Sequence, residues 1–126
     1  PKISFTHQAP ERKNSWHLFV VLAPDSIEGR YRNALFLELQ HRGIQGNVHY
    51  IPIYRFDFYK QYGFRTEDFP VAEEMFRRVI TLPLYPGLRE EEVSSVITAI
   101  GDSLKIISTE LSLLDKHREH NLHSTG

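Results

Sequence analysis

Cysteine is absent from this sequence of 126 residues, and methionine and tryptophan occur once each. Without cysteine there is no disulfide framework, no thiolate zinc site and no cysteine nucleophile, which fits a reducing, cytoplasmic compartment. No apolar run approaches the roughly 20 residues that a membrane-spanning helix needs. Acidic and basic residues nearly cancel, giving a net charge of -1, so no overall positive field attracts nucleic acid or an anionic membrane. We therefore expect neither a nucleic-acid partner nor a membrane partner.

Several catalytic motifs are also missing. The sequence has no Gly-rich phosphate loop of the Walker or dinucleotide type and no Gly-x-Ser-x-Gly elbow. Most acidic residues stand in runs typical of helix starts and solvent faces, such as Glu73, Glu74, Glu90, Glu91 and Glu92. A histidine series near the end of the chain is more typical of a solvated tail than of a metal site: His117, His120 and His123. We predict no metal ligand and no catalytic residue.

What remains is the composition of one globular domain, with 40% hydrophobic and 25% charged residues. Residues 1–15 are polar and aperiodic and predict a linker or irregular arm. Residues 16–114 form the predicted domain, and residues 115–126 a polar tail. Because the chain opens at Pro1 without Met, we expect a domain cut from a longer protein.

The first half of the domain predicts a strand followed by a helix. Residues 16–22 are aromatic and β-branched and predict a mostly buried strand, with His17 as a structural histidine inside it. Apolar residues four apart then predict a helix ending near Gly43, which can adopt the left-handed conformation. Asp25 or Ser26 is the expected cap, with Glu28 completing a capping box.

The second half predicts a second strand at 47–51, ended by Pro52, and then an aromatic loop at 53–64 with one helical turn. A helix with Pro70 in its first turn, a short strand at 79–82 and a long helix from about Arg89 follow. The order β-α-β-loop-α-β-α predicts an α+β fold, with a sheet of three to four strands and helices on one face.

The strand end at 47–51 and the aromatic loop supply the candidate binding residues. Strand ends and the loops after them often carry binding groups, and polar-tipped rings can stack on a sugar or heterocycle. Positive charge nearby can meet a phosphate. The substrate-binding candidates are His49, Tyr50, Tyr54, Arg55 and Tyr59. The alternative is that most of these rings only pack the loop onto its own core.

The same region resembles a known family. The motifs that carry the resemblance are SWHLFVVL, then NVHYIPIYRFDFYKQYGF, then DFPVAEEMFRRVITLPLYPGL. Together they resemble the C-terminal part of the DegT/StrS-type nucleotide-sugar aminotransferases, pyridoxal-phosphate enzymes of the aspartate-aminotransferase fold. Within that family they are most similar to the transaminases that make UDP-4-amino-4,6-dideoxy-N-acetyl-altrosamine, a precursor of pseudaminic acid. Many relatives have histidine where this chain has Tyr54.

The resemblance implies that this chain is a small C-terminal domain without the catalytic machinery. In the family, a lysine of the N-terminal large domain holds pyridoxal phosphate, and none of the five lysines here stands in that context. The parent would be a homodimer that moves an amino group, usually from glutamate, to a 4-keto UDP-sugar. The isolated chain would be inactive, and the loop around His49, Tyr50 and Tyr54 would line the sugar-nucleotide pocket.

Two other classes of function stay open on the residues alone. One is a free-standing α+β ligand-binding or regulatory module, which would use the same aromatic loop for a small ligand. The other is an interaction domain that self-associates through exposed apolar surface.

Overall fold

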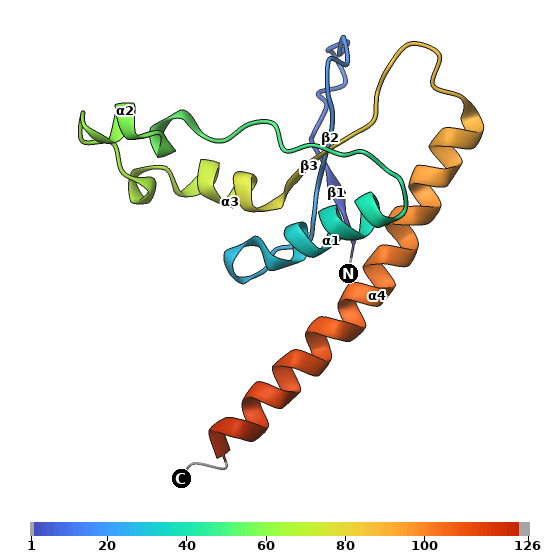
Figure 1. Cartoon of the computed structure of the whole chain (residues 1–126). Helices are drawn as coiled ribbons and strands as arrows, with labels where there is room; N and C mark the ends of the chain where they lie inside the picture. The colour runs from blue at the N-terminus through green and yellow to red at the C-terminus, as the bar shows by residue number, and fades with distance from the viewer. Residues whose placement is uncertain (1, 124–126) are drawn as a thin grey trace.

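The computed structural model describes the backbone of residues 2–123 and the side chains of residues 2–114. Its sheet has three antiparallel strands in the order β1 (Ser4–Phe5), β2 (Phe19–Leu22) and β3 (Val79–Leu82). Its helices are α1 (Arg30–His41), α2 (Asp57–Lys60), α3 (Pro70–Arg78) and α4 (Glu90–His123). Figure 1 shows the small sheet at the centre, with α1 and the long α4 to one side. The predicted α+β fold is confirmed.

The central pair of strands follows the apolar sequence pattern. β2 and β3 are in register from Phe19 opposite Leu82 to Leu22 opposite Val79, and all four residues of β3 are buried. The predicted strand at 79–82 is confirmed. The predicted strand at 16–22 is too long, since Trp16 has a positive φ and its N–H bonds to Asn14 Oδ1 at 2.8 Å.

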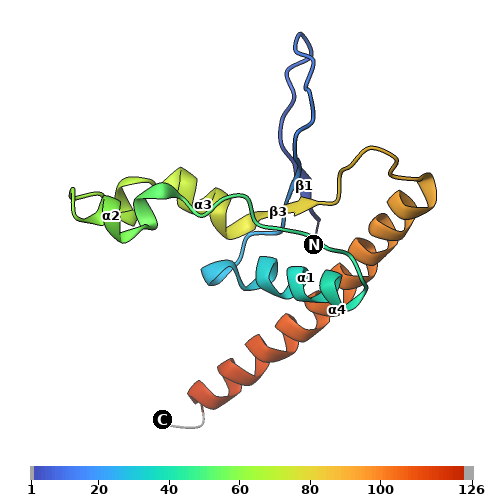
Figure 2. The ribbon, with the colours of Figure 1, turned by 45° about the horizontal axis from the view of Figure 1, so that its top comes forward.

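The N-terminal arm is not irregular throughout, because Ser4 and Phe5 pair with Leu22 and Val21 as the edge strand β1. Between β1 and β2 the chain makes a long excursion away from the sheet, which Figure 2 shows rising above the helices. His17 lies at the end of this excursion, exposed and outside the strand. The expectation of a structural histidine inside β2 is therefore wrong.

The core lies where α1 meets the sheet and α4. Leu35 and Leu39 on α1, Ile80 on β3 and Ile107 on α4 are all at most 1% exposed. The Tyr31 hydroxyl links α1 to α4, lying 3.1 Å from the Leu104 carbonyl oxygen and 2.9 Å from Ser108 Oγ. The predicted apolar face of α1 is confirmed for Tyr31, Leu35 and Leu39, which hold α4 in place by packing and hydrogen bonding. Ile27, the first of the predicted apolar residues four apart, lies before the helix and is 70% exposed.

The start of α1 differs from the predicted capping box. The Asp25 side chain accepts the N–H of Ser26 at 2.9 Å, and Ser26 Oγ accepts the N–H of Tyr31 at 2.8 Å. Glu28 has a positive φ of 56° and lies in a 3-10 turn, so α1 begins later, at Arg30. Both cap candidates are therefore engaged in turning the chain before the helix, and the box does not form.

The remaining helices largely match expectation. α3 begins with Pro70, and Gly43 after α1 has the predicted positive φ of 77°. α4 begins at Glu90, and Glu92 accepts the N–H of Arg89 at 2.9 Å. The helix continues to His123, so the backbone of the predicted polar tail is helical to that residue. The side chains of His117, His120 and His123 lie outside the described residues, as do residues 124–126.

The predicted strand at 47–51 is wrong apart from one residue. Asn47 pairs with Thr81 through two backbone hydrogen bonds of 2.9 and 2.7 Å, which form an isolated bridge on the free side of β3. The Asn47 side chain then accepts the N–H of Val48 at 2.7 Å. That local bond competes with a continued ladder, and the chain leaves the sheet.

Residues 53–69 form a projection that we call the aromatic lobe. It contains a 3-10 turn at Ile53–Arg55 and the single-turn helix α2, which confirms a structured loop with a helical turn. Figure 1 shows it extending away from the sheet beside α3. Many of its apolar side chains are exposed, among them Ile53, Phe56, Phe58, Tyr62 and Phe64. Within residues 2–123, no helix has the length and apolar character to cross a bilayer.

Candidate functional site

A small cavity lies between the end of the N-terminal excursion, the 45–49 segment and β3. Its volume is about 170 Å³, and five of its eight lining side chains are polar: two imidazoles, two amides and one hydroxyl, beside three leucines. The lining residues are His17, Leu18, Gln45, Asn47, His49, Thr81, Leu82 and Leu84. Of the predicted site residues, His49 is the one in this lining. The cavity thus offers hydrogen-bond donors and acceptors, and its lining contains no Lys, Arg, Asp or Glu.

His49 is fixed in place from two sides. Its Nδ1 lies 3.1 Å from Thr81 Oγ1, and its ring centroid lies 4.6 Å from that of Tyr50. His49 is half-buried, whereas Tyr50 is 68% exposed and projects at the surface beside it. The pair therefore combines a held imidazole at the cavity with an exposed phenol against that imidazole.

Tyr54 is buried in the aromatic lobe, away from the cavity lining. Its ring stacks on Phe69, with centroids 4.3 Å apart and planes 13° from parallel. Burial, and then the neighbouring Glu73 carboxylate, raises the pKa of the Tyr54 phenol. No group among the described residues meets both distance and angle for a hydrogen bond to its buried hydroxyl. Tyr54 is thus a packing residue of the lobe, and its hydroxyl lies near the Glu73 carboxylate.

Arg55 is engaged within the protein. Its guanidinium donates two hydrogen bonds to the Glu73 carboxylate of α3, one of them 2.9 Å long, and lies 5.0 Å from the centre of the Phe76 ring. Phe76 meets a second guanidinium, that of Arg32 on α1, at 5.4 Å. Tyr59 packs edge-on against Phe58 in α2. Arg55 and Tyr59 therefore belong to the aromatic lobe and its junction with α3.

The ion pair between Arg55 and Glu73 makes the lobe junction sensitive to acid. The hydrogen bonds from Arg55 hold the pKa of Glu73 below its ordinary value of 4.5. A carboxyl whose folded pKa is depressed stabilises the fold at higher pH, and this contribution is lost as the pH falls from about 4.5 through the folded pKa.

We expect Glu73→Gln to reduce this acid sensitivity and to lower the free energy of unfolding at neutral pH by about 1 kcal/mol, since Arg55 is partly exposed. Urea denaturation at neutral and acidic pH measures both effects. Glu74→Gln is the control, because it removes an ion pair within α3, between Glu74 and Arg78, and the Glu74 side chain is 48% exposed against 13% for Glu73. An acid dependence unchanged by Glu73→Gln would contradict this role for the ion pair.

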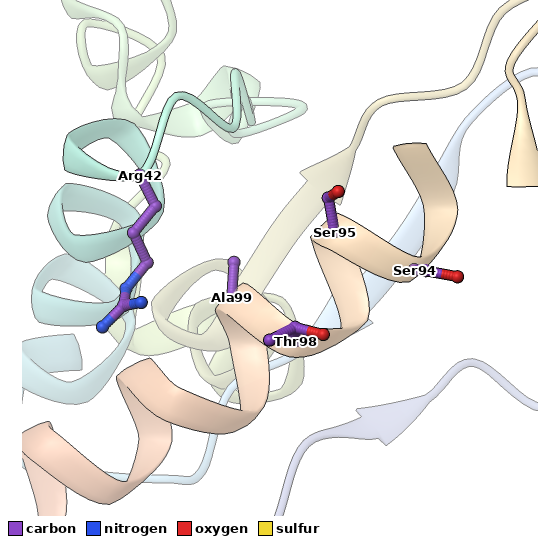
Figure 3. A pocket seen from close by; sticks show the side chains of 5 residues that line it. All are labelled: Arg42, Ser94, Ser95, Thr98 and Ala99. Carbon is purple, nitrogen blue, oxygen red and sulfur yellow. The ribbon is translucent and has the colours of Figure 1, made fainter. Parts of the chain in front are cut away.

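A second cavity, of about 380 Å³, lies at the start of α4 beside the end of α1. Arg42, Ser94, Ser95, Thr98 and Ala99 line it. Figure 3 shows that the hydroxyls of Ser94 and Thr98 point away from Arg42. Ser95 Oγ already donates to the Glu91 carbonyl oxygen at 2.8 Å. These side chains do not converge on one point, so this surface defines no ligand site.

The described residues do not fit pyridoxal phosphate. Holding that cofactor requires a lysine that forms a Schiff base in a protected site. All four lysines with described side chains are exposed, and two of them are paired: Lys60 with Asp57 at 2.9 Å and Lys105 with Asp102 at 3.3 Å. No cluster of three metal-binding side chains occurs within the described part of the chain. Any cofactor lysine must therefore come from outside residues 2–114.

The sequence pattern missed most of the cavity lining. Gln45, Asn47, Thr81 and His17 come from three separate segments that meet only in the folded chain. One signal was present: Thr81 is the single hydroxyl in the otherwise apolar run VITL, and a polar side chain in a buried strand needs a partner.

The fold is one shared with sugar aminotransferases. The "putative sugar aminotransferase Spr1654" of Streptococcus pneumoniae, in its PMP-form, matches with a TM-score of 0.72 and 31% identity over 81% of this chain and 25% of that chain. PseC of Helicobacter pylori, an aminotransferase involved in pseudoaminic acid biosynthesis, matches with a TM-score of 0.62 and 28% identity over 71% of this chain and 24% of its own.

The chain belongs to the DegT/DnrJ/EryC1/StrS aminotransferase family, whose sequence pattern matches residues 1–101. A curated relative, the spore coat polysaccharide biosynthesis protein SpsC of Bacillus subtilis, is 33% identical over 103 residues, which are 80% of this chain and 26% of SpsC. The chain thus spans about a quarter of the length of these relatives. The family resemblance seen in the motifs is confirmed.

Proposed function

We propose that this chain is the C-terminal small domain of a pyridoxal-phosphate-dependent aminotransferase that acts on a nucleotide sugar. The whole protein would move an amino group from glutamate to C4 of a UDP-4-keto-6-deoxy sugar, for cell-surface glycan biosynthesis. The match to the aminotransferase family over residues 1–101 is the observation that carries the proposal. A cytoplasmic location goes with it, because nucleotide sugars are made there.

The role of this domain would be binding, with the cofactor held by an N-terminal large domain. The exposed lysines favour that division, because none offers a protected amine. His49 and Tyr50 are the proposed direct contacts to the sugar nucleotide: His49 lines the cavity, and Tyr50 is exposed beside it. Neutral imidazole and phenol groups can donate to sugar, phosphate or base oxygens and stack on a ring.

Tyr54, Arg55 and Tyr59 would shape the same binding region through the aromatic lobe. The Tyr54 stack on Phe69 and the Arg55 bonds to Glu73 give the lobe a fixed conformation. The lobe exposes a cluster of apolar side chains, a feature typical of interaction surfaces. This supports contact of the lobe with the large domain or with a second subunit of a homodimer.

Substitution of His49 tests the binding role. In the complete protein that contains this chain, we expect His49→Ala to lower kcat/KM for the keto-sugar nucleotide by about 10-fold to 100-fold, the loss of one or two hydrogen bonds. The change in the visible absorption band of the cofactor on adding glutamate should stay as in the unsubstituted protein. Steady-state kinetics and absorption spectra provide the two measurements.

His41→Ala is the matched control, because His41 is a 75% exposed histidine at the end of α1 and does not line the cavity. Equal loss of the glutamate response and of sugar-nucleotide use in His49→Ala would contradict a binding role. No cofactor band at all in the complete protein would overturn the aminotransferase proposal and favour a ligand-binding module.

A further inference from the structure

Thr81 stands at the one point where β3 meets both β2 and the 47–49 segment. The backbone of Thr81 is paired with Val20 of β2 on one side and with Asn47 on the other. The two bonds to Asn47 use backbone atoms alone, with lengths of 2.9 and 2.7 Å. The Thr81 side chain is therefore not needed to hold the segment, and it is only 5% exposed.

The partners available to the Thr81 hydroxyl indicate to which atom it donates its hydrogen. Among the described residues, the one partner of Oγ1 is Nδ1 of His49, at 3.1 Å. If Nδ1 carried the proton, the hydroxyl hydrogen would have no acceptor among the described residues and would depend on water in the cavity. The arrangement that satisfies both groups has the hydroxyl donating to an unprotonated Nδ1. In the neutral ring, the proton then sits on Nε2.

We propose that Thr81 is a positioning residue: its hydroxyl donates to Nδ1 of His49 and so presents Nε2–H as a fixed donor for an oxygen of the sugar nucleotide. The assignment rests on the proposed function of His49. Two contacts determine the ring, the Thr81 bond in its plane and Tyr50 against it. A ring held at Nδ1 has Nε2 as its one free nitrogen.

The chemistry of the cavity agrees with a neutral donor. Its other polar lining groups are the amides of Gln45 and Asn47 and the imidazole of His17. None of these groups carries a permanent charge that would attract any ligand oxygen. A fixed Nε2–H of His49 would therefore select a ligand oxygen by the direction of the hydrogen bond. A ring free to flip would present donor and acceptor alternately and would bind less well.

Two variants separate the hydroxyl from the rest of Thr81. Thr81→Val keeps the branched shape, the backbone bonds to Asn47 and the strand preference, and replaces the hydroxyl with a methyl group. Thr81→Ser keeps the O–H and loses a methyl group. A structural role of the methyl group would weaken the serine variant, whereas the positioning role weakens the valine variant.

The first measurement is the tautomer of His49, read from long-range proton–nitrogen NMR correlations of the imidazole in this chain. The seven histidines are assigned with the help of His49→Gln. We expect the Nε2–H form in the unsubstituted and serine proteins and a mixture of forms in the valine protein. An Nδ1–H form in the unsubstituted protein, or a valine variant without change, would overturn the proposal.

The second measurement is kinetic and uses the complete protein. We expect Thr81→Val to raise KM for the keto-sugar nucleotide about tenfold, with kcat and the glutamate response of the cofactor unchanged and Thr81→Ser within about twofold of the parent. Equal effects of valine and serine would overturn the positioning role. The two measurements can also disagree. If the complete protein uses no sugar nucleotide but Thr81→Val gives the mixture of His49 tautomers, the proposed function is wrong, whereas the hydrogen bond from Thr81 to His49 is supported.

Discussion

Replacing Leu35 by alanine should lower the free energy of unfolding by about 2–5 kcal/mol, the range for large-to-small changes in a packed core. Leu35 is 0% exposed and belongs to the cluster in which α1, β3 and α4 meet. Removing the end of the Leu35 side chain leaves a cavity between α1, β3 and α4. A shift of one of these elements alone would not close it. Urea denaturation followed by circular dichroism measures the loss.

Leu37→Ala supplies the control, because Leu37 lies in the same helix and is 54% exposed. The substitution and the helix propensity change are the same at both positions, so the difference between them reports burial alone. We expect Leu37→Ala to cost less than about 1 kcal/mol. Similar losses at the two positions would mean that α1 does not pack as described.

Gly29→Ala is the second change with a large expected effect, about 2–5 kcal/mol of unfolding free energy. Gly29 precedes α1 with φ at 68°, a conformation that costs an L-residue about 1–2 kcal/mol. A Cβ there would also lie 2.9 Å from the Arg77 carbonyl oxygen, and relieving such overpacking costs about 1–3 kcal/mol. The two terms add, because the nearest atoms are the backbone oxygen and Cα of Arg77, which cannot rotate away as the end of a side chain can.

Gly43→Ala isolates the first term. Gly43 has a similar φ of 77°, but a Cβ there would meet no atom within 4 Å. We expect Gly43→Ala to cost only the conformational part, and thermal or urea unfolding of the two variants gives the difference. Equal losses would show that α3 shifts away from Gly29 without cost.

The sequence predicted those parts of the fold that depend on local patterns. The apolar face of α1, Pro70 at the start of α3, the strand at 79–82 and the start of α4 all follow from periodicity and end signals. The strand at 47–51 failed because the Asn47 side chain bonds the next amide, which hydrophobic pattern does not reveal. The capping box failed for a similar reason, since Ser26 bonds Tyr31 instead.

The candidate site was predicted in part. The aromatic stretch and His49 stand out in the sequence. The sequence does not show that His49 lines a cavity whereas the aromatic residues form a separate lobe. Arg55 looked free for a phosphate because its partner Glu73 is 18 residues away and on another helix. Thr81 became a candidate only when the bridge to Asn47 placed it against the imidazole.

Both edges of the sheet are short. β1 contributes two residues on one side, and the other side of β3 is met by the single residue Asn47. Neither edge presents a long row of free N–H and C=O groups, the feature by which sheets recruit strands from other molecules. Among the described residues, association by adding a strand to either edge of this sheet is therefore disfavoured.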